Sequence, residues 1–132
     1  MTDKELMLAA ENARQNSYSP YSGFAVGAAL LTKDGKVYAG CNIENASFSP
    51  TVCAERVAFF AAVKEGEKEF DRIAIVGGKK NEKPQPFCPP CGVCRQVMSE
   101  FCGSDFKIIL GNSESFSVHT LGDILPLGFD LK

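Results

Sequence analysis

The sequence predicts an α/β fold in which helices cover a mixed sheet of roughly five strands, built as a single domain over residues 1–132. Apolar runs with helical spacing alternate along the chain with short β-rich runs. A length of 132 residues with 45% hydrophobic and 23% charged side chains also suits one compact core. No internal repeat or low-complexity segment interrupts this pattern.

The first half of the chain predicts a helix and then a β-hairpin. Residues 3–16 carry apolar side chains at helical spacing, and Thr2 is a candidate N-cap in front of them. Apolar runs at 24–32 and 36–42 are separated by Lys33-Asp34-Gly35. This arrangement predicts two antiparallel strands joined by a turn that contains glycine.

The second half predicts a βαβ-like order of elements. Residues 52–64 have helical spacing, and Gly66 lies just beyond them. The later elements are a strand at 72–76, a helix at 91–101, a strand at 105–110, an edge strand at 115–119 and a short helix from Leu121 that ends at Pro126. The polar stretch 77–90 predicts a loop, and its first residues, Gly77-Gly78-Lys79-Lys80, predict a solvated turn.

The charge and hydropathy patterns argue against nucleic acid and membrane partners. A formal net charge of −2 gives no broad positive field for a polyanion. The longest apolar run, 24–31, contains Gly27 and is too short to span a bilayer, and no basic segment precedes an apolar stretch. We therefore expect a soluble cytoplasmic protein, in which the six cysteines are thiols or metal ligands and not disulfides.

Three cysteines and a glutamate have the spacing of a catalytic metal site. Cys91 and Cys94 stand at i and i+3 at a predicted helix start, so both thiols project to one face. Cys53 opens the other predicted helix, with Glu55 two residues further on. Because catalytic zinc takes three protein ligands and leaves the fourth position to water, these residues predict a zinc site with an adjacent base.

Such a site needs positive charge around it. Three thiolates and Zn²⁺ together carry a charge of about −1, which weakens the metal's effect on the pKa of water. The two predicted helix N-termini supply roughly +0.5 charge each. Arg56, next to Glu55, is placed to donate hydrogen bonds to the thiolates.

The metal motifs resemble those of the small, homotetrameric class of cytidine deaminases. They are Cys53-Ala54-Glu55-Arg56 and Pro90-Cys91-Gly92-Val93-Cys94-Arg95-Gln96. The resemblance extends over nearly the whole chain, and its further motifs are Tyr21-Ser22-Gly23-Phe24, Val26-Gly27-Ala28-Ala29-Leu30, Gly40-Cys41-Asn42-Ile43-Glu44-Asn45-Ala46 and Leu125-Pro126 followed by Phe129. It implies hydrolytic deamination of cytidine and 2'-deoxycytidine to uridine and 2'-deoxyuridine plus ammonia, a reaction of pyrimidine salvage.

The resemblance also implies roles for single residues. Zinc would activate a water that attacks C4 of cytosine, while Glu55 moves protons from the water to N3 and to the departing amine. Asn42 and Glu44 would bind the sugar, with the charge of Glu44 disfavouring a phosphate. The remaining substrate contacts implied are Phe24 against the base, Ala54 within the metal motif and Phe129 supplied to the pocket of a neighbouring subunit.

Alternatives remain for several of these residues. Cys88 forms a second C-x-x-C with Cys91, so a closed four-cysteine structural zinc site is one alternative. For Phe24 and Phe129 taken alone, core packing is the alternative. Phe48 departs from the tyrosine common in the family, which removes a hydroxyl contact there. A deaminase of cytosine-bearing antibiotic nucleosides of the blasticidin type is the nearest enzymatic rival, and a structural zinc module is the non-enzymatic one.

Overall fold

The computed structural model describes residues 1–132 without a gap. Its elements in chain order are α1 (Asp3–Arg14), β1 (Phe24–Thr32), β2 (Val37–Cys41), α2 (Ala54–Lys64), β3 (Phe70–Lys79), α3 (Gly92–Phe101), β4 (Lys107–Gly111), β5 (Phe116–Thr120) and α4 (Leu121–Ile124). Thr2 caps α1, since its side chain accepts from the amide of Glu5 while the Glu5 carboxylate accepts from the amide of Thr2. The predicted N-cap is thus confirmed.

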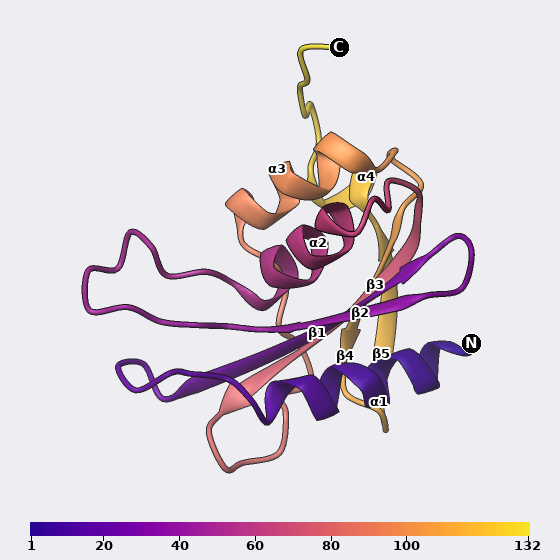
Figure 1. The fold of residues 1–132 in the computed structure, drawn as a ribbon. Coiled ribbons are helices and arrows are strands. Elements are labelled where there is room, and N and C mark those ends of the chain that lie inside the picture. The colour runs from indigo at the N-terminus through magenta and orange to yellow at the C-terminus, as the bar shows by residue number, and fades with distance from the viewer.

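The strands form one five-stranded sheet in the order β2-β1-β3-β4-β5 (Figure 1). Only β3 and β4 pair in parallel, and α3 connects them as the crossover helix of a βαβ unit. The other neighbouring pairs are antiparallel. The predicted α/β fold with a mixed, helix-covered sheet of about five strands is confirmed.

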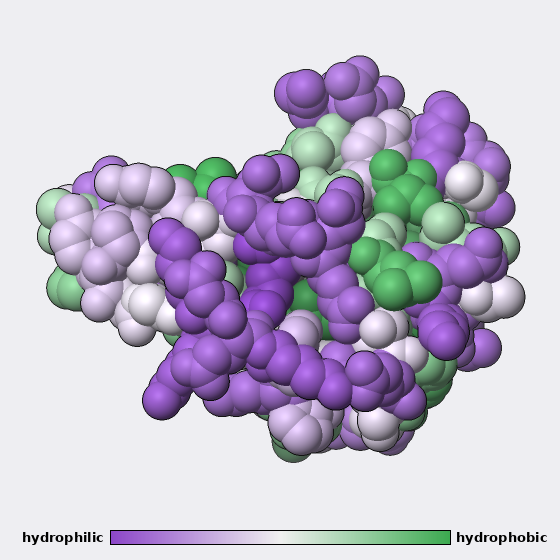
Figure 2. All heavy atoms as spheres, turned by 90° about the horizontal axis from the view of Figure 1, so that it is seen from below, coloured by the Kyte–Doolittle hydropathy of each residue, from purple (hydrophilic) through white to green (hydrophobic).

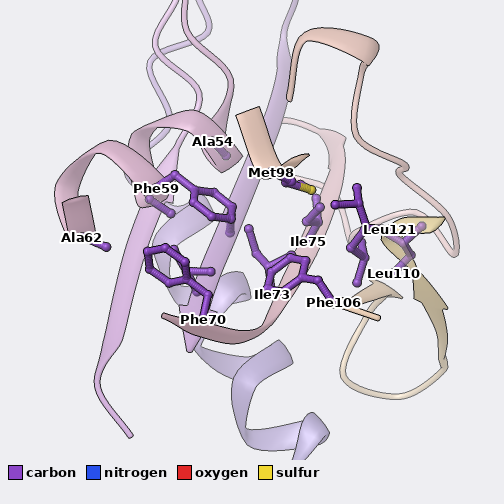
Figure 3. Packing of buried hydrophobic residues seen from close by; sticks show 14 residues of the cluster. Ala54, Phe59, Ala62, Phe70, Ile73, Ile75, Met98, Phe106, Leu110 and Leu121 are labelled. Carbon is purple, nitrogen blue, oxygen red and sulfur yellow. The ribbon is translucent and has the colours of Figure 1, made fainter. Parts of the chain in front are cut away.

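Helices lie on both faces of the sheet, so the sheet separates two apolar clusters. On one face α1 covers β1 and β3, and its cluster consists of Leu6, Met7, Ala10, Ala29, Leu31, Ala74, Val76 and Ile109. On the other face α2 and α3 pack over a larger cluster in which Phe59 is fully buried (Figure 3). Burying a phenylalanine side chain of this kind contributes about 1.5–3 kcal/mol. The packing of α2 and α3 on this larger cluster positions the N-terminal ends of both helices.

The position of α2 depends on a close approach to β2. A Cβ atom at Gly40 would overlap the carbonyl oxygen of Ala54 and the amide nitrogen of Ala58, at less than ordinary contact distance. Glycine therefore allows the first turn of α2 to lie directly on the strand. As a result, the start of α2 is held against the sheet, where its first side chains face the start of α3.

The end of β3 differs from the prediction. Gly77 and Gly78 are not a solvated turn: both are buried and continue the strand, with Gly77 paired to Val26 and Gly78 to Ala25. The absence of side chains has a packing reason, because a methyl group at Gly77 would overlap Cys88 Sγ. Only Lys79 and Lys80 at the end of the run are exposed.

The helix ends also differ slightly from the prediction. The first helix stops at Arg14 and not at 16, and the helix predicted over 52–64 begins at Ala54 with Cys53 as its N-cap. From the α1 side the surface is largely hydrophilic, with smaller apolar patches (Figure 2). The structure contains no helix with the length and apolar character needed to cross a bilayer.

Candidate active site

Three cysteine sulfurs meet where α2 and α3 begin. Cys53 is the N-cap of α2 and Cys91 is the N-cap of α3, both with extended backbone conformation, and Cys94 lies in the first turn of α3. Cys91 Sγ lies 3.9 Å from Cys53 Sγ and 3.5 Å from Cys94 Sγ. All three sulfurs lie within 4.8 Å of one another. The structure therefore brings together the three residues that the sequence predicts as metal ligands.

The sulfur triangle fits a tetrahedral zinc ion. Zinc–sulfur bonds of about 2.3 Å at tetrahedral angles place two sulfurs about 3.8 Å apart. The separations of 3.5 and 3.9 Å lie close to this value, so little movement is needed to hold the ion. Three thiolates also form the donor set that zinc prefers, and the helix N-termini partly offset their charge.

Cys53 carries an acidified thiol. A hydrogen bond from the Cys94 thiol, with a further contribution from Arg56, lowers the pKa of Cys53 to about 5. The same contact raises the pKa of Cys94, because that thiol holds the shared proton. Arg56 Nη2 donates to Cys53 Sγ at 3.4 Å, in the geometry that the sequence predicts for charge compensation. The low pKa of Cys53 means that the cluster contains a thiolate, the form of cysteine that binds a metal cation.

Glu55 lies beside the sulfurs with only 4% of its surface exposed. Burial raises the pKa of Glu55 to about 7. A hydrogen bond with the residue's own backbone in the first turn of α2 lowers the pKa, but by less. A carboxyl group with a pKa near neutral can both take up and release a proton during turnover. The buried glutamate therefore has the properties expected of a proton-transfer group.

A cavity of about 200 Å³ opens over Glu55. Its lining residues are Val26, Asn42, Glu44, Thr51, Val52, Cys53, Ala54, Glu55, Cys88, Pro89 and Cys91. A second cavity of about 270 Å³ shares Glu44 and Thr51 with it and is also lined by Tyr21, Ser22 and Phe48. Together they form a cleft with the sulfur cluster at one end and Glu44 between its two parts.

The amide of Asn42 is almost fully engaged in holding β1. Its Oδ1 accepts from the amide of Val26 at 2.9 Å and from the hydroxyl of Ser17, and its Nδ2 donates to the carbonyl oxygen of Phe24 at 2.8 Å. One N–H of the side-chain amide remains for another partner. Asn42 can therefore offer the cavity a donor but not an acceptor.

Glu44 is fixed by the loop that precedes β1. Its Oε1 accepts from the amides of Tyr21 and Ser22 at 3.0 and 3.1 Å, and its Oε2 accepts from the Ser22 hydroxyl. The Ser22 hydrogen bond lowers the pKa of Glu44, so the side chain is ionised at neutral pH. It offers the cleft acceptors and a negative charge.

Two predicted substrate contacts lie outside the cavity lining. Phe24 is half-buried, and its ring lies against Gly77 next to Cys88. Phe129 is 69% exposed near the C-terminus, where its carbonyl oxygen accepts from Gln96, so it has no contact with the cavity of its own chain. The core-packing alternative is wrong for Phe129.

The cavity is also lined by residues that were not predicted from the sequence. Val26 follows Phe24 by two positions on β1, so alternation along the strand could have identified it. Thr51 and Val52 precede the metal motif in an irregular segment, and Pro89 lies in the loop before α3. No periodic signal exists for such loop positions.

Cys88 lies in the cavity wall but outside the sulfur cluster, which contains Cys53, Cys91 and Cys94 alone. Its sulfur is directed against Gly77, and burial raises the pKa of this thiol to about 11. The geometry thus favours three cysteine ligands over the closed four-cysteine alternative. Three cysteine ligands would leave the fourth coordination position of a zinc ion open for water, as a catalytic site requires.

Comparison with known proteins agrees with this geometry. The model of the cytidine and deoxycytidylate deaminase zinc-binding region matches residues 1–110. The chain belongs to the cytidine deaminase family. It is 46% identical to a cytidine deaminase of Halalkalibacterium halodurans, over 96% of this chain and 94% of that protein.

Solved structures of the cytidine deaminase family have the same fold. The crystal structure of a cytidine deaminase from Burkholderia pseudomallei superposes with a TM-score of 0.88 at 47% identity, covering 98% of this chain and 100% of that chain. A blasticidin-S deaminase from Bacillus cereus is more distant, with 33% identity over 79% of this chain and 76% of that protein. The chain is thus an enzyme of the cytidine deaminase family.

Proposed function

We propose that the enzyme catalyses zinc-dependent hydrolytic deamination of cytidine and 2'-deoxycytidine to uridine and 2'-deoxyuridine plus ammonia, as a step of pyrimidine salvage. The observation that carries the proposal is a buried carboxyl group beside three convergent sulfurs at one end of a cleft. A hydrolytic deaminase needs an activated water, a proton shuttle and a pocket for a flat base. This site supplies residues for each.

Cys53, Cys91 and Cys94 would hold the zinc, whose chemistry when bound is to activate water as a Lewis acid. Glu55 would take one proton from the water that adds to C4 and pass it to N3 of the base. The same carboxylate would then take the remaining proton from the oxygen added at C4 and deliver it to the amine, so that the C4–N bond breaks, the C4 carbonyl forms and ammonia leaves. Glu55 has two oxygens, so it can accept at one and donate at the other.

Asn42 and Glu44 would bind the sugar, and their free groups are complementary. The remaining N–H of Asn42 can donate to a hydroxyl oxygen, and the ionised Glu44 can accept the proton of a hydroxyl group. A sugar hydroxyl both donates and accepts, so it can satisfy the two residues at once. The proposed substrate is therefore a nucleoside whose base points toward Glu55.

The direct test is an ultraviolet assay of cytidine loss by the purified enzyme, with and without a strong zinc chelator. We expect turnover that disappears with the chelator and returns when zinc is added back. Blasticidin S, assayed in parallel, tests the rival substrate class. If the protein contains its full zinc but consumes neither cytidine nor blasticidin S, the structural-module alternative is supported instead.

We expect the enzyme to discriminate against cytidine monophosphate. Glu44 is ionised and lies in the cleft, where it would repel a phosphate on the sugar. The value of kcat/KM should be lower for the monophosphate than for cytidine, and Glu44→Gln should reduce the ratio between them. Equal kcat/KM values in wild type, or a ratio unchanged in Glu44→Gln, would contradict this role of Glu44.

We expect the active form to be a homo-oligomer, and we propose a homotetramer. Phe129 is exposed and remote from its own cavity, which suits a residue that completes the pocket of a neighbour. Phe129→Ala should raise KM for cytidine by about tenfold, the loss expected for an aromatic contact worth 0.5–1.5 kcal/mol plus its buried area. Size-exclusion chromatography at assay concentration should show the oligomer.

A matched control for Phe129→Ala is Leu8→Ala. Leu8 is also an exposed apolar side chain, at 48% exposure, but it belongs to α1 on the opposite face of the sheet. Leu8→Ala should leave KM unchanged. A fully active monomer would rule out the subunit-sharing model.

We also propose that residues 1–132 act as one catalytic domain in the cytoplasm. All six cysteines are free, and the site needs three of them as reduced thiols, a state maintained in reducing compartments. The partner is a small molecule, since the net charge of −2 does not favour a polynucleotide.

A further inference from the structure

The segment between β3 and α3, here called the wall loop and comprising residues 80–90, forms one side of the cavity. Cys88 and Pro89 line the cavity from this loop, and Cys91 follows it directly. The wall loop has no helix or strand of its own, so its shape depends on contacts with the rest of the fold. Its anchors therefore determine the position of the cavity wall.

Arg14, the last residue of α1, makes three hydrogen bonds to backbone carbonyl groups around the start of this loop. Its Nε donates to Ala25 on β1 at 2.8 Å, its Nη2 to Lys79 at the end of β3 at 2.7 Å and its Nη1 to Glu82 in the wall loop at 2.8 Å. The guanidinium group forms no ion pair with an acidic side chain. Its planar fork thus joins two strands and the wall loop to the end of α1.

The wall loop has further anchors, most of them between uncharged groups. The amide of Lys80 donates to the carbonyl oxygen of Gly23 at 2.7 Å, and the ring of Phe87 packs edge-on against His119. The amide of Gln85 donates to the carbonyl oxygen of Gly77 at 2.7 Å. Lys83 and Glu114 form an exposed ion pair, and such surface pairs contribute little. Hydrogen bonds from a charged donor such as Arg14 are about twice as strong as neutral ones. Arg14 is therefore a principal anchor at the β3 end of the loop.

The α3 end of the loop has a separate anchor. Arg95 Nε donates to the carbonyl oxygen of Pro90 at 2.8 Å, and Arg95 Nη1 donates to that of Ile124 at 2.6 Å. This contact lies next to Cys91 and holds the predicted ligand independently of Arg14. Arg95 thus holds the α3 end of the wall loop together with the predicted ligand, and Arg14 holds the β3 end.

We infer that Arg14 is a positioning residue for substrate binding: it holds the wall loop so that Cys88 and Pro89 close the cavity around the base. The inference rests on the proposed function, because it assigns the cavity to a nucleoside. Without the fork of Arg14 the wall moves, while the sulfur cluster and Glu55 stay at the helix starts. Loss of Arg14 consequently weakens binding of the substrate more than it slows its conversion.

The test compares Arg14→Lys and Arg14→Gln with wild type in cytidine turnover and zinc content. Both variants should raise KM for cytidine by at least about threefold, with kcat and one zinc per chain retained, which is the pattern of lost substrate binding. Lysine keeps the charge but cannot serve three separate carbonyl groups, so it should not rescue the defect. Wild-type KM in Arg14→Lys would overturn the inference.

Arg72→Gln is the matched control. Arg72 ties the other end of α1 to β3, with its Nε 2.9 Å from Asp3 Oδ1, and it lies away from the wall loop. Its replacement loosens the same helix–sheet interface, but KM should remain that of wild type. An equal rise of KM in Arg72→Gln would show general loosening and would also overturn the inference.

Gly78→Ala provides a milder probe if the Arg14 variants do not fold. A Cβ atom there would lie 3.2 Å from Arg14 Nη2, from the amide nitrogen of Gln85 and from the carbonyl oxygen of Lys83, so Arg14 and the loop backbone must shift by a few tenths of an ångström while no group is removed. KM should rise by a smaller factor, and an unchanged KM would count against the role of Arg14.

Amide hydrogen exchange separates this inference from the proposed function. Arg14→Lys or Gly78→Ala should speed exchange in the wall loop, and at Gln85 above all, relative to wild type and Arg72→Gln. This measurement does not depend on turnover. If wild type fails to deaminate cytidine, the proposed function is wrong, whereas unchanged exchange in these variants contradicts the Arg14 contact itself.

Discussion

Glu55→Gln is expected to lose 10²- to 10⁴-fold in cytidine turnover while retaining its metal and its fold. This range is the usual cost of removing acid–base catalysis and corresponds to about 3–5 kcal/mol of transition-state stabilisation. The loss can be larger when one residue serves several proton transfers, as proposed for Glu55.

The reason lies in the buried position of Glu55. Burial raises its pKa to about 7, so the carboxyl group can pass between its charged and neutral forms during one turnover. Glutamine is close in size to the neutral form and can still donate a hydrogen bond. It cannot accept a proton from water and return it, so the relay stops at the first step.

The measurement pairs zinc stoichiometry with turnover for purified Glu55→Gln. Zinc should stay near one per chain, because the proposed ligands are Cys53, Cys91 and Cys94. Glu65→Gln is the matched control: it is the same change at the exposed C-cap of the same helix and should behave as wild type. Near wild-type turnover in Glu55→Gln would remove Glu55 from the mechanism, and loss of zinc would instead make it part of the metal site.

Most of the fold could be predicted because its elements carry strong local signals. The hairpin of β1 and β2 follows from two apolar runs around a glycine turn, and the starts of α2 and α3 follow from helical spacing. The strand at Gly77 and Gly78 could not be predicted in this way. Gly77 is required by the close approach of Cys88, a contact between residues 11 positions apart that no local pattern contains.

In the candidate site, too, some residues are evident from local sequence spacing and others only from tertiary contacts. Cys91 and Cys94 share one helical turn, so their convergence is visible in the spacing. That Cys53 joins them follows only from how α2 and α3 pack. The cavity wall depends still more on tertiary contacts, since Arg14 reaches Lys79 and Glu82 across 65 and 68 positions of sequence. Local reasoning therefore finds the reactive groups more readily than the residues that position them.

Cys91→Ser is expected to lose zinc and, with it, essentially all deaminase activity. Cys91 is the central member of the cluster, with its sulfur 3.5 Å from that of Cys94 and 3.9 Å from that of Cys53. A serine hydroxyl remains protonated at neutral pH and is a much weaker zinc ligand than a thiolate. Two thiolates alone do not complete the three-ligand set of a catalytic site.

The control is Cys88→Ser, the same change three residues earlier. Cys88 lies in the cavity wall with its sulfur against Gly77 and takes no part in the sulfur cluster. This variant should keep one zinc per chain and substantial activity. Thermal unfolding provides a second measurement, because a ligand that binds only the folded state raises Tm. Added zinc should raise Tm for metal-free wild type and Cys88→Ser but not for Cys91→Ser, and loss of zinc from Cys88→Ser would overturn the ligand assignment.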